Sequence, residues 1–192
     1  MLRYVAIDGL RVDLHALAEL DHRCDPRICT IGRCCCARYE VCIRPAELSR
    51  IVGLLPHAAR FCPGLRSGKG FDNIFEDLGQ GLCCLDTTEE GLCVLAYGER
   101  GRVRCSLHSA AQALGLPAHR AKPRACVLWP LALSSARPRV LSVDPDVYGF
   151  GCATRRPAGA ALCGAVVETL ERVFGAAFRR RVEDAVGKPA AA

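Results

Sequence analysis

The chain contains 14 cysteines in 192 residues, and their density defines the chemistry to expect. The densest stretch runs from Cys24 to Cys42, and the others are spread as far as Cys163. Packing alone does not select so many thiols, because the reactivity of cysteine usually decides where it is kept. Metal ligation, disulfide bonding and redox chemistry are therefore the three functions to weigh.

The compartment decides between these functions. Asp8-Gly9 interrupts the first apolar residues at once, so no secretory signal is expected, and no apolar stretch approaches the ~20 residues of a membrane helix. We therefore expect a cytoplasmic protein without a membrane partner. In a reducing cytosol, dense cysteines favour metal binding over disulfides. A disulfide-bonded exported protein is the alternative, and the adjacent Cys34-Cys35-Cys36 argues against it.

Composition and charge narrow the class of partner. The chain is 51% hydrophobic and 24% charged, which excludes a disordered chain, a collagen or a coiled coil. Its formal charge of +6 counts every thiol as neutral. A four-thiolate site that holds a divalent ion or a [4Fe–4S]²⁺ cluster carries about −2, because each ligand is a thiolate. We therefore do not expect a nucleic-acid partner, and the sequence leaves a protein partner unknown.

The spacing of the cysteines excludes the commonest small metal sites. A zinc ribbon or finger would show cysteine pairs two to four residues apart, repeated once, but only the Cys24–Cys36 stretch has short loops. No Cys-x-x-Cys pair occurs, so the two-residue loops of bacterial ferredoxins are also absent. Ligands must instead come from loops that are distant in the sequence. Four thiolates complete one tetrahedral ion or one cubane cluster.

Three further residues allow more than one interpretation. His108 follows Cys105 by three residues, so on a helix the two share a face. That spacing suits a histidine ligand or a Cys–His pair, but also a histidine that packs the helix. Cys42 and Cys62 have apolar neighbours, which favours buried structural thiols over ligands.

The elements expected in the first half of the chain begin with a hairpin. Asp8-Gly9 is a favoured two-residue turn between strands at 5–7 and 10–12. A short helix is expected over 13–20, a strand over 41–44, and a loop over 61–81. Pro45 opens a helix with four residues on one apolar face: Leu48, Ile51, Val52 and Leu55.

Short strands and helices are also expected in the second half. Apolar runs predict strands over 82–85, 92–96, 126–133 and 140–143. Ser106 is the expected cap of a helix that ends at Leu114. The clearest pattern is one long amphipathic helix over 158–186, stopped by Gly187-Lys188-Pro189.

The expected fold class is α+β: a small, irregular, metal-stapled domain with short strands and a long C-terminal amphipathic helix. A single metal-binding domain is expected over 1–187, with a disordered tail over 188–192.

Several motifs together resemble one bacterial family. Cys24-Asp-Pro-Arg-Ile-Cys29 followed by a Cys-Cys pair resembles the first motif of the YkgJ-type cysteine-cluster proteins, which are described as zinc- or iron-chelating. Gly91-Leu-Cys93 and Gly101-Arg-Val-Arg-Cys105 are similar to later motifs. Lys122-Pro-Arg-Ala-Cys126-Val-Leu-Trp-Pro130 resembles the family's Lys-Pro-x-x-Cys-x-x-aromatic-Pro segment. The resemblance spans roughly residues 20 to 185.

The resemblance implies a site of about eight cysteine ligands. On this sequence they are Cys24, Cys29, Cys34, Cys35, Cys93, Cys105, Cys126 and Cys152. The family's cysteine pair matches either Cys34-Cys35 or Cys35-Cys36. Cys83, Cys84 and Cys163 have no firm counterpart.

The function expected is therefore that of a cytoplasmic metal-binding protein. Its cofactor is zinc or an iron–sulfur cluster, between which thiolate ligands alone do not decide. The alternative is an iron–sulfur-dependent enzyme of redox or methyl-transfer chemistry, because the resemblance extends to a flagellin lysine methylase with a similar cluster on a larger chain. Whether the protein is an enzyme, and on what substrate, stays open.

Overall fold

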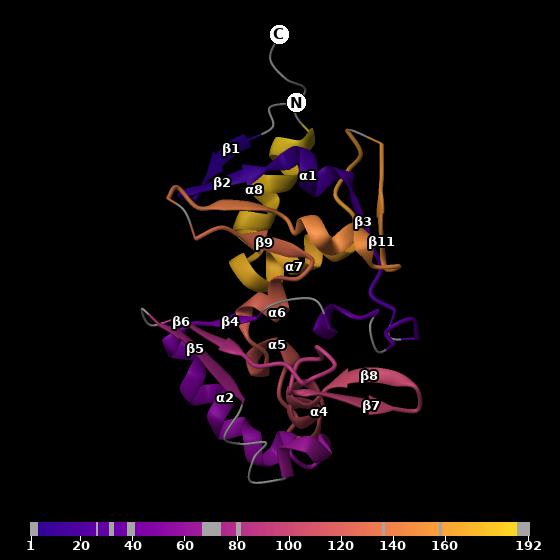
Figure 1. The fold of residues 1–192 in the computed structure, drawn as a ribbon. Helices are drawn as coiled ribbons and strands as arrows, with labels where there is room; N and C mark the ends of the chain where they lie inside the picture. The colour runs from indigo at the N-terminus through magenta and orange to yellow at the C-terminus, as the bar shows by residue number, and fades with distance from the viewer. Residues whose placement is uncertain are drawn as a thin grey trace. The chain divides into compact units, whose positions relative to one another are not determined.

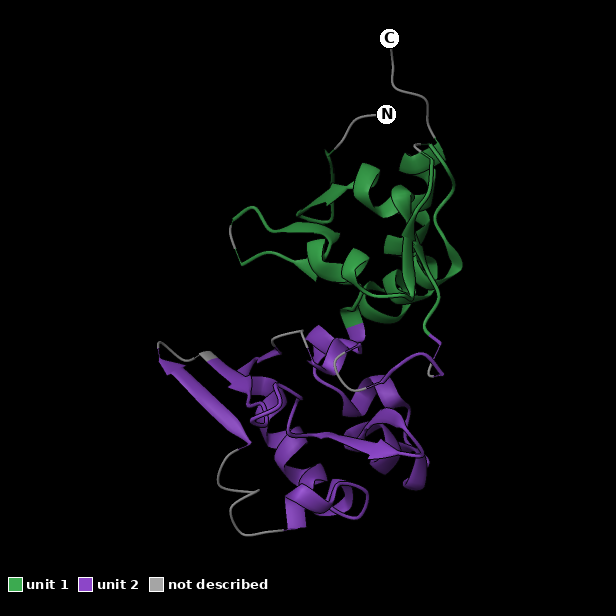
Figure 2. Cartoon of the chain, turned by 45° about the vertical axis from the view of Figure 1, so that its right-hand side comes forward, with its two compact units in different colours: residues 1–24, 128–192 green, residues 25–127 purple. Residues whose placement is uncertain are grey.

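The computed structural model describes residues 4–25, 27–30, 33–37, 41–66, 74–79, 82–135, 137–157 and 159–187. Helices and strands are both present, as an α+β fold requires (Figure 1). The chain divides into two compact units, Met1–Cys24 with Leu128–Ala192 (unit 1) and Asp25–Val127 (unit 2) (Figure 2). The single domain over 1–187 stays a prediction, and the tail expected over 188–192 lies outside the described residues. No helix within the described ranges is long and apolar enough to span a membrane.

Unit 1 contains a four-stranded sheet in the order β1-β2-β10-β9. Strands β1 (Tyr4–Ile7) and β2 (Leu10–Asp13) form the expected antiparallel hairpin. Its turn residues Asp8 and Gly9 have φ values of 49° and 77°, which a type I′ turn requires. Strand β10 (Val140–Val143), also as expected, runs parallel to β2, and β9 (Leu131–Leu133) pairs antiparallel with β10.

A second ladder and three helices complete unit 1. Helix α1 (Leu14–Glu19) confirms the helix expected there, and the Asp13 carboxylate caps it by accepting a 3.1 Å hydrogen bond from the Ala16 N–H. Strand β3 (Leu20–His22) pairs antiparallel with β11 (Ala153–Arg155), which follows the 3₁₀ helix η3 (Pro145–Gly149). Side chains from the four-stranded sheet, from α1 and from the two C-terminal helices described next form one apolar core.

The prediction of one long C-terminal helix is wrong. The structure has two helices, α7 (Gly164–Phe174) and α8 (Ala176–Gly187), and the residues described between 159 and 163 are not helical. Gly175 separates the helices with φ 89° and ψ 162°, a conformation essentially restricted to glycine. The apolar period continues through the break because both helices bury residues in the same core.

Unit 2 contains a three-stranded antiparallel sheet in the order β4-β6-β5 and a helix, α2. The strands are β4 (Cys42–Ile43), β6 (Leu82–Leu85) and β5 (Phe75–Gly79). Helix α2 (Pro45–Ala58) begins at the proline, as expected. Its buried face differs from the expected one, because Leu54 is buried whereas Val52 is 47% exposed. The buried face also includes a carboxylate, Glu47, which a purely apolar pattern does not reveal.

The rest of unit 2 is a hairpin followed by short helices. Strands β7 (Ala96–Glu99) and β8 (Arg102–Cys105) pair through a turn at Arg100-Gly101, where both φ values are again positive. Helices α4 (Ser106–Ala113), α5 (Ala118–Ala121) and α6 (Arg124–Leu128) follow, the last ending at the first residue of the second stretch of unit 1. Two 3₁₀ turns, η1 (Cys35–Ala37) and η2 (Pro63–Arg66), precede them.

Four local predictions need correction in these segments. The strand expected over 92–96 is a single bridge from Cys93 to Thr87, and strand β7 starts only at Ala96. The strand expected over 126–133 begins as helix α6 and is extended only in β9. The loop expected over 61–81 includes η2 and β5, with residues 67–73, 80 and 81 outside the described ranges. Helix α4 forms, but Cys105 rather than Ser106 is its N-cap.

Candidate metal centre

Backbone hydrogen bonds hold the segment that contains Cys29, Cys34, Cys35 and Cys36, the first cysteine segment, against the β7–β8 hairpin and the residues just before it. The Cys93 N–H donates to the Cys36 carbonyl at 2.8 Å, and the Val103 N–H in β8 donates to the Cys29 carbonyl at 2.9 Å. The Ala37 N–H bonds to the Cys34 carbonyl at 3.0 Å and closes the turn of η1. These bonds place Cys36 directly beside Cys93, although the two are far apart in the sequence.

The hairpin then connects Cys93 to Cys105. The Ala96 N–H donates to the Cys93 carbonyl at 2.7 Å, and Ala96 is the register partner of Cys105 across the β7–β8 ladder. Cys105 ends β8 and caps helix α4. The Ser106 hydroxyl fixes this junction through a 2.7 Å bond to the Leu95 carbonyl. Cys93 and Cys105, from the second half of unit 2, therefore lie close to the first cysteine segment.

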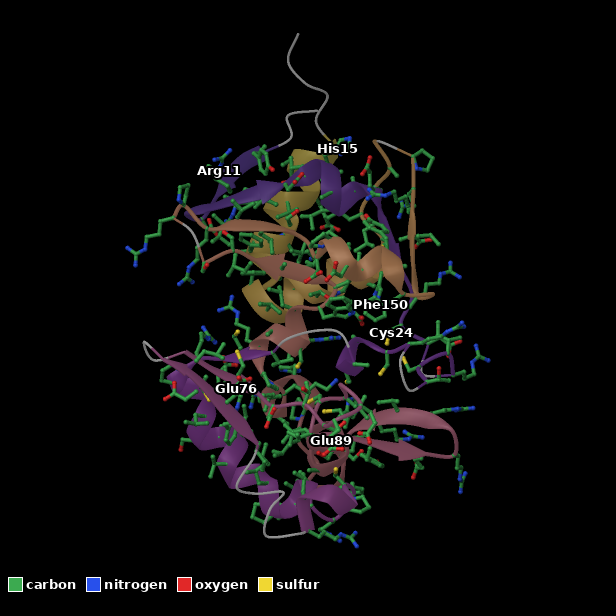
Figure 3. All side chains as sticks on the ribbon, viewed as in Figure 1. Arg11, His15, Cys24, Glu76, Glu89 and Phe150 are labelled. Atoms are coloured by element: carbon green, nitrogen blue, oxygen red, sulfur yellow. The ribbon has the colours of Figure 1, made fainter. Side chains whose placement is uncertain are left out.

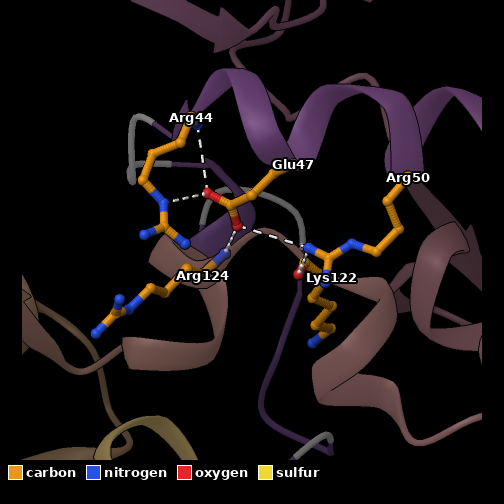
Figure 4. A network of polar contacts seen from close by, with 5 residues as sticks. All are labelled: Arg44, Glu47, Arg50, Lys122 and Arg124. Atoms are coloured by element: carbon orange, nitrogen blue, oxygen red, sulfur yellow. Dashed lines mark hydrogen bonds and ion pairs between the residues drawn. The ribbon is translucent and has the colours of Figure 1, made fainter.

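A buried carboxylate positions the segment that contains Lys122 and Cys126 (Figure 4). The Glu47 side chain, 7% exposed, accepts hydrogen bonds from the Arg124 N–H at 2.6 Å and from the Arg44 Nε at 2.9 Å. Arg50 lies 3.6 Å from the same carboxylate and donates to the Lys122 carbonyl at 3.1 Å. Although burial raises the pKa of Glu47, hydrogen bonds from Arg44 and Arg124 outweigh burial, so the pKa lies below its ordinary value. Helix α2 thus anchors the start of α6.

Five thiols in unit 2 lie within electrostatic reach of one another, and we call them the thiol cluster: Cys35, Cys36, Cys93, Cys105 and Cys126. Burial, and then the charges of Cys105 and Cys93, raise the pKa of Cys126. Burial also raises the pKa of Cys93 to about 12. A hydrogen bond between their side chains lowers the pKa of Cys35 and raises that of Cys36, because it favours the thiolate at Cys35.

Lys122 places a cation beside these thiols. Burial lowers the pKa of its ammonium group, but the charges of Cys105, Cys126, Cys36 and Cys35 raise it more, so the net shift is upward. A lysine that stays charged beside several thiols favours their thiolate forms. Burial and the charges of Lys122 and Arg104 lower the pKa of His108, which favours a neutral imidazole close to the same group.

The structure brings together only part of the ligand set predicted from the resemblance. Cys35, Cys93, Cys105 and Cys126 belong to the thiol cluster. Cys34 is 2% exposed and packs in a small apolar group with Ala96 and Val103, while Cys29 borders that group. Of the two cysteine pairs that the sequence left open, Cys35-Cys36 is the one whose members both belong to the thiol cluster.

The remaining two predicted ligands lie in unit 1. Cys24 follows β3 (Figure 3) and Cys152 directly precedes β11, so both lie at the same end of the β3–β11 ladder. The Arg23 N–H donates to the Cys152 carbonyl at 2.9 Å and extends that ladder. The structure therefore brings Cys24 and Cys152 to the same end of one ladder, and their membership of one site with the thiol cluster stays a prediction.

Two residues of the thiol cluster and its surroundings, Cys36 and Lys122, were not among the predicted site residues. Cys36 was one of three adjacent candidates, and the bond from Cys93 to its carbonyl and its interactions with the Cys93 and Cys105 thiols distinguish it from Cys34. Lys122 belongs to a motif that the sequence presents, but nothing in the sequence alone says that its half-buried side chain lies beside thiols. Of the two thiols expected to be buried, Cys62 is buried, whereas Cys42 is exposed at the edge of β4.

The donor set fits a thiophilic metal by its chemistry. Cysteine thiolates are the ligands that zinc and iron–sulfur clusters prefer, and coordination deprotonates them even where burial raises the pKa. In the described part of the chain, no three His, Cys, Asp or Glu side chains already converge as ligands of one ion. Closing a site around a metal would therefore require the cysteine side chains to move.

Comparisons with protein-family models, with curated proteins and with solved structures gave no match to this chain.

Proposed function

We propose that the protein binds a metal, as zinc or an iron–sulfur cluster, through thiolates of the thiol cluster in unit 2. The observation that carries the proposal is the gathering of Cys35, Cys36, Cys93, Cys105 and Cys126 from four separate segments, with the half-buried Lys122 beside four of them. Four thiolates complete either kind of centre, so the cluster holds one thiol more than is needed.

The charges in the cluster support this assignment. A four-thiolate centre with a divalent ion or a [4Fe–4S]²⁺ cluster carries about −2, and such a charge needs compensation where it is buried. Lys122 would supply one positive charge to it, and the Glu47 network holds the backbone of that lysine in place. When bound, the metal would hold four segments of unit 2 together, and an iron–sulfur cluster would also transfer electrons.

Metal and acid-labile sulfide assays on the full chain, purified without oxygen, test the proposal. We expect stoichiometric zinc without sulfide, or iron with matching sulfide and a brown colour. The double variant Cys105→Ser/Cys126→Ser, which leaves three cluster thiols, should lose most of this metal. Cys83→Ser is the matched control, because Cys83 lies on β6 outside the cluster, and it should keep the metal.

Two results would contradict the proposal. One is a folded wild-type chain that contains neither metal nor sulfide after anaerobic purification. The other is unchanged metal content in the double variant, with far-ultraviolet circular dichroism confirming that it is folded.

A further inference from the structure

A second pair of thiols lies outside the proposed metal centre, on the β4–β6 ladder. Cys42 in β4 is the register partner of Cys84 in β6, and their Sγ atoms are 2.7 Å apart. The two cysteines come from segments 42 positions apart, so only the sheet brings them together. Neither belongs to the ligand set predicted from the sequence.

The backbone of the ladder suits a covalent bond between these two residues. The Leu85 N–H donates to the Val41 carbonyl at 2.9 Å, so Val41 and Leu85 form a hydrogen-bonded pair. Because such pairs alternate along an antiparallel ladder, Cys42 and Cys84 form a non-hydrogen-bonded pair, whose Cα atoms are typically about 4.5 Å apart. That separation lies within the range of disulfides, about 4.4–6.8 Å.

The two thiols differ in their access to solvent. Cys42 is exposed, whereas Cys84 is 1% exposed. The neighbouring Cys83 pairs with Ile43 and Asp77 rather than with Cys42, so the alternation of the strand turns it to the other face of β6. Cys84 in turn has Glu76 of β5 as its partner (Figure 3). A reagent in solution therefore reaches Cys42 first, and Cys84 is the thiol in contact with it.

We propose that Cys42 and Cys84 form a reversible disulfide site that responds to low-molecular-weight disulfides. The Cys42 thiolate attacks one sulfur of a disulfide such as glutathione disulfide, breaks its S–S bond and releases one glutathione thiolate. The Cys84 thiolate then attacks the Cys42 sulfur and releases the second. The two protons of the protein thiols end on the two glutathione thiolates. The protein loses two electrons, which the glutathione disulfide gains.

The position of this bond would link it to the metal centre, a consequence that rests on the proposed function. Strand β4 follows the segment that contains Cys35 and Cys36, and β6 precedes Cys93. A Cys42–Cys84 disulfide would therefore join the two segments that bring these cluster thiols together. A dithiol would reverse the bond by the same exchange.

The full chain with its native metal content, treated with glutathione disulfide, tests the proposal. After free thiols are blocked with N-ethylmaleimide, trypsin releases Cys42 in the peptide 39–50 and Cys84 in the peptide 70–100. Mass spectrometry should find these peptides joined through Cys42 and Cys84, and dithiothreitol should separate them. Cys84→Ser should stop at the mixed disulfide between Cys42 and glutathione, and Cys83→Ser should still form the link.

Three results would overturn the proposal. In the first result, wild-type Cys42 stays fully alkylated or stops at the mixed disulfide. In the second result, the link runs through Cys83 instead of Cys84. The third result is a loss of bound metal in Cys42→Ser, which would make Cys42 a ligand instead. The exposure of Cys42 makes this variant a mild change to the fold. A wild-type chain that forms the link but contains no metal would contradict the proposed function and leave this one standing.

Discussion

The cores of unit 1 and unit 2 are built from different chemistry. In unit 1, leucine, valine and phenylalanine side chains from the sheet and from α1, α7 and α8 form one core, with Cys163 at its edge. In unit 2, the apolar core is bordered by Cys93, Cys105 and Cys126, and a smaller group is centred on Cys34. All the cysteines except Cys24, Cys152 and Cys163 lie in unit 2.

The comparison shows two ways in which short elements are stabilised. Burial of apolar surface contributes about 25 cal/mol per Å², and unit 1 obtains it from continuous packing of a sheet and helices. Unit 2 places thiols where aliphatic side chains would otherwise pack. A structural zinc site has an apparent binding free energy of about 10–16 kcal/mol in small peptides, comparable to the whole stability of a domain. Under the proposed function, the fold of unit 2 should therefore depend on bound metal.

Removal of the metal should produce the largest difference between the units. With a chelator, we expect amide hydrogen exchange to accelerate by at least tenfold around η1, Cys93 and the β7–β8 hairpin. Amides of β2 and β10 in unit 1 should keep their protection, because aliphatic packing holds them. Equal loss of protection in both units, or none in either, would contradict the contrast.

The Glu47→Gln substitution should have an intermediate effect that is confined to unit 2. It removes a buried charge that accepts bonds from the backbone of Arg124 and the side chain of Arg44. Hydrogen bonds to charged groups contribute about 1.5–3 kcal/mol, so urea unfolding should report a loss of that order. Metal retention should fall with it, because the bonds of Glu47 and Arg50 hold the segment from Lys122 to Cys126.

The pH dependence of this effect follows from the lowered pKa of Glu47. The folded state binds the proton more weakly than the unfolded state, in which the pKa is near its ordinary value of 4.5. The contribution of Glu47 is therefore complete above that pH and is lost as the pH falls through the folded pKa. The stability difference between wild type and Glu47→Gln should shrink below about pH 4.5. A difference that stays constant down to pH 3 would contradict the charged network.

The Gly175→Ala substitution should have the smallest effect, and only in unit 1. Among the described residues, no heavy atom beyond the neighbouring backbone lies within 4 Å of an added Cβ at Gly175 or at Gly164, so neither change meets a steric clash there. Gly175 has a positive φ of 89°, whereas the φ of Gly164 lies outside that region. We expect Gly175→Ala to cost about 1–3 kcal/mol and Gly164→Ala much less, measured by thermal unfolding. Equal costs would show that the α7–α8 break does not depend on the backbone of Gly175.

The sequence predicted those elements whose signals are local. Asp8-Gly9 predicted its hairpin and Pro45 predicted the start of α2, since each residue directly restricts the backbone. The break at Gly175 was missed because the apolar period continues across it. Strand β5 was missed because its side chains after Phe75 are exposed, and only its pairing with β6 makes it a strand. The apolar run from Cys126 suits a short helix as well as a strand.

The sequence predicted that the candidate site is made of cysteines, but it did not predict which residues belong to it. Sequence motifs identified Cys35, Cys93, Cys105 and Cys126, which the structure gathers in the thiol cluster. They did not separate Cys34 from Cys36, because adjacent residues differ only in the direction of their side chains. The role of Lys122 and the pairing of Cys42 with Cys84 both depend on long-range packing.

X-ray absorption at the metal edge of the anaerobically purified chain tests the thiolate centre most directly. We expect a first shell made of sulfur, at about 2.3 Å for zinc, which weakens when Cys126 and Cys105 are both replaced by serine. A neighbouring iron shell in the same spectrum would identify a cluster instead of a single ion. A first shell of nitrogen or oxygen, or a sulfur shell that persists in the double variant, would contradict a metal centre built on the thiols of unit 2.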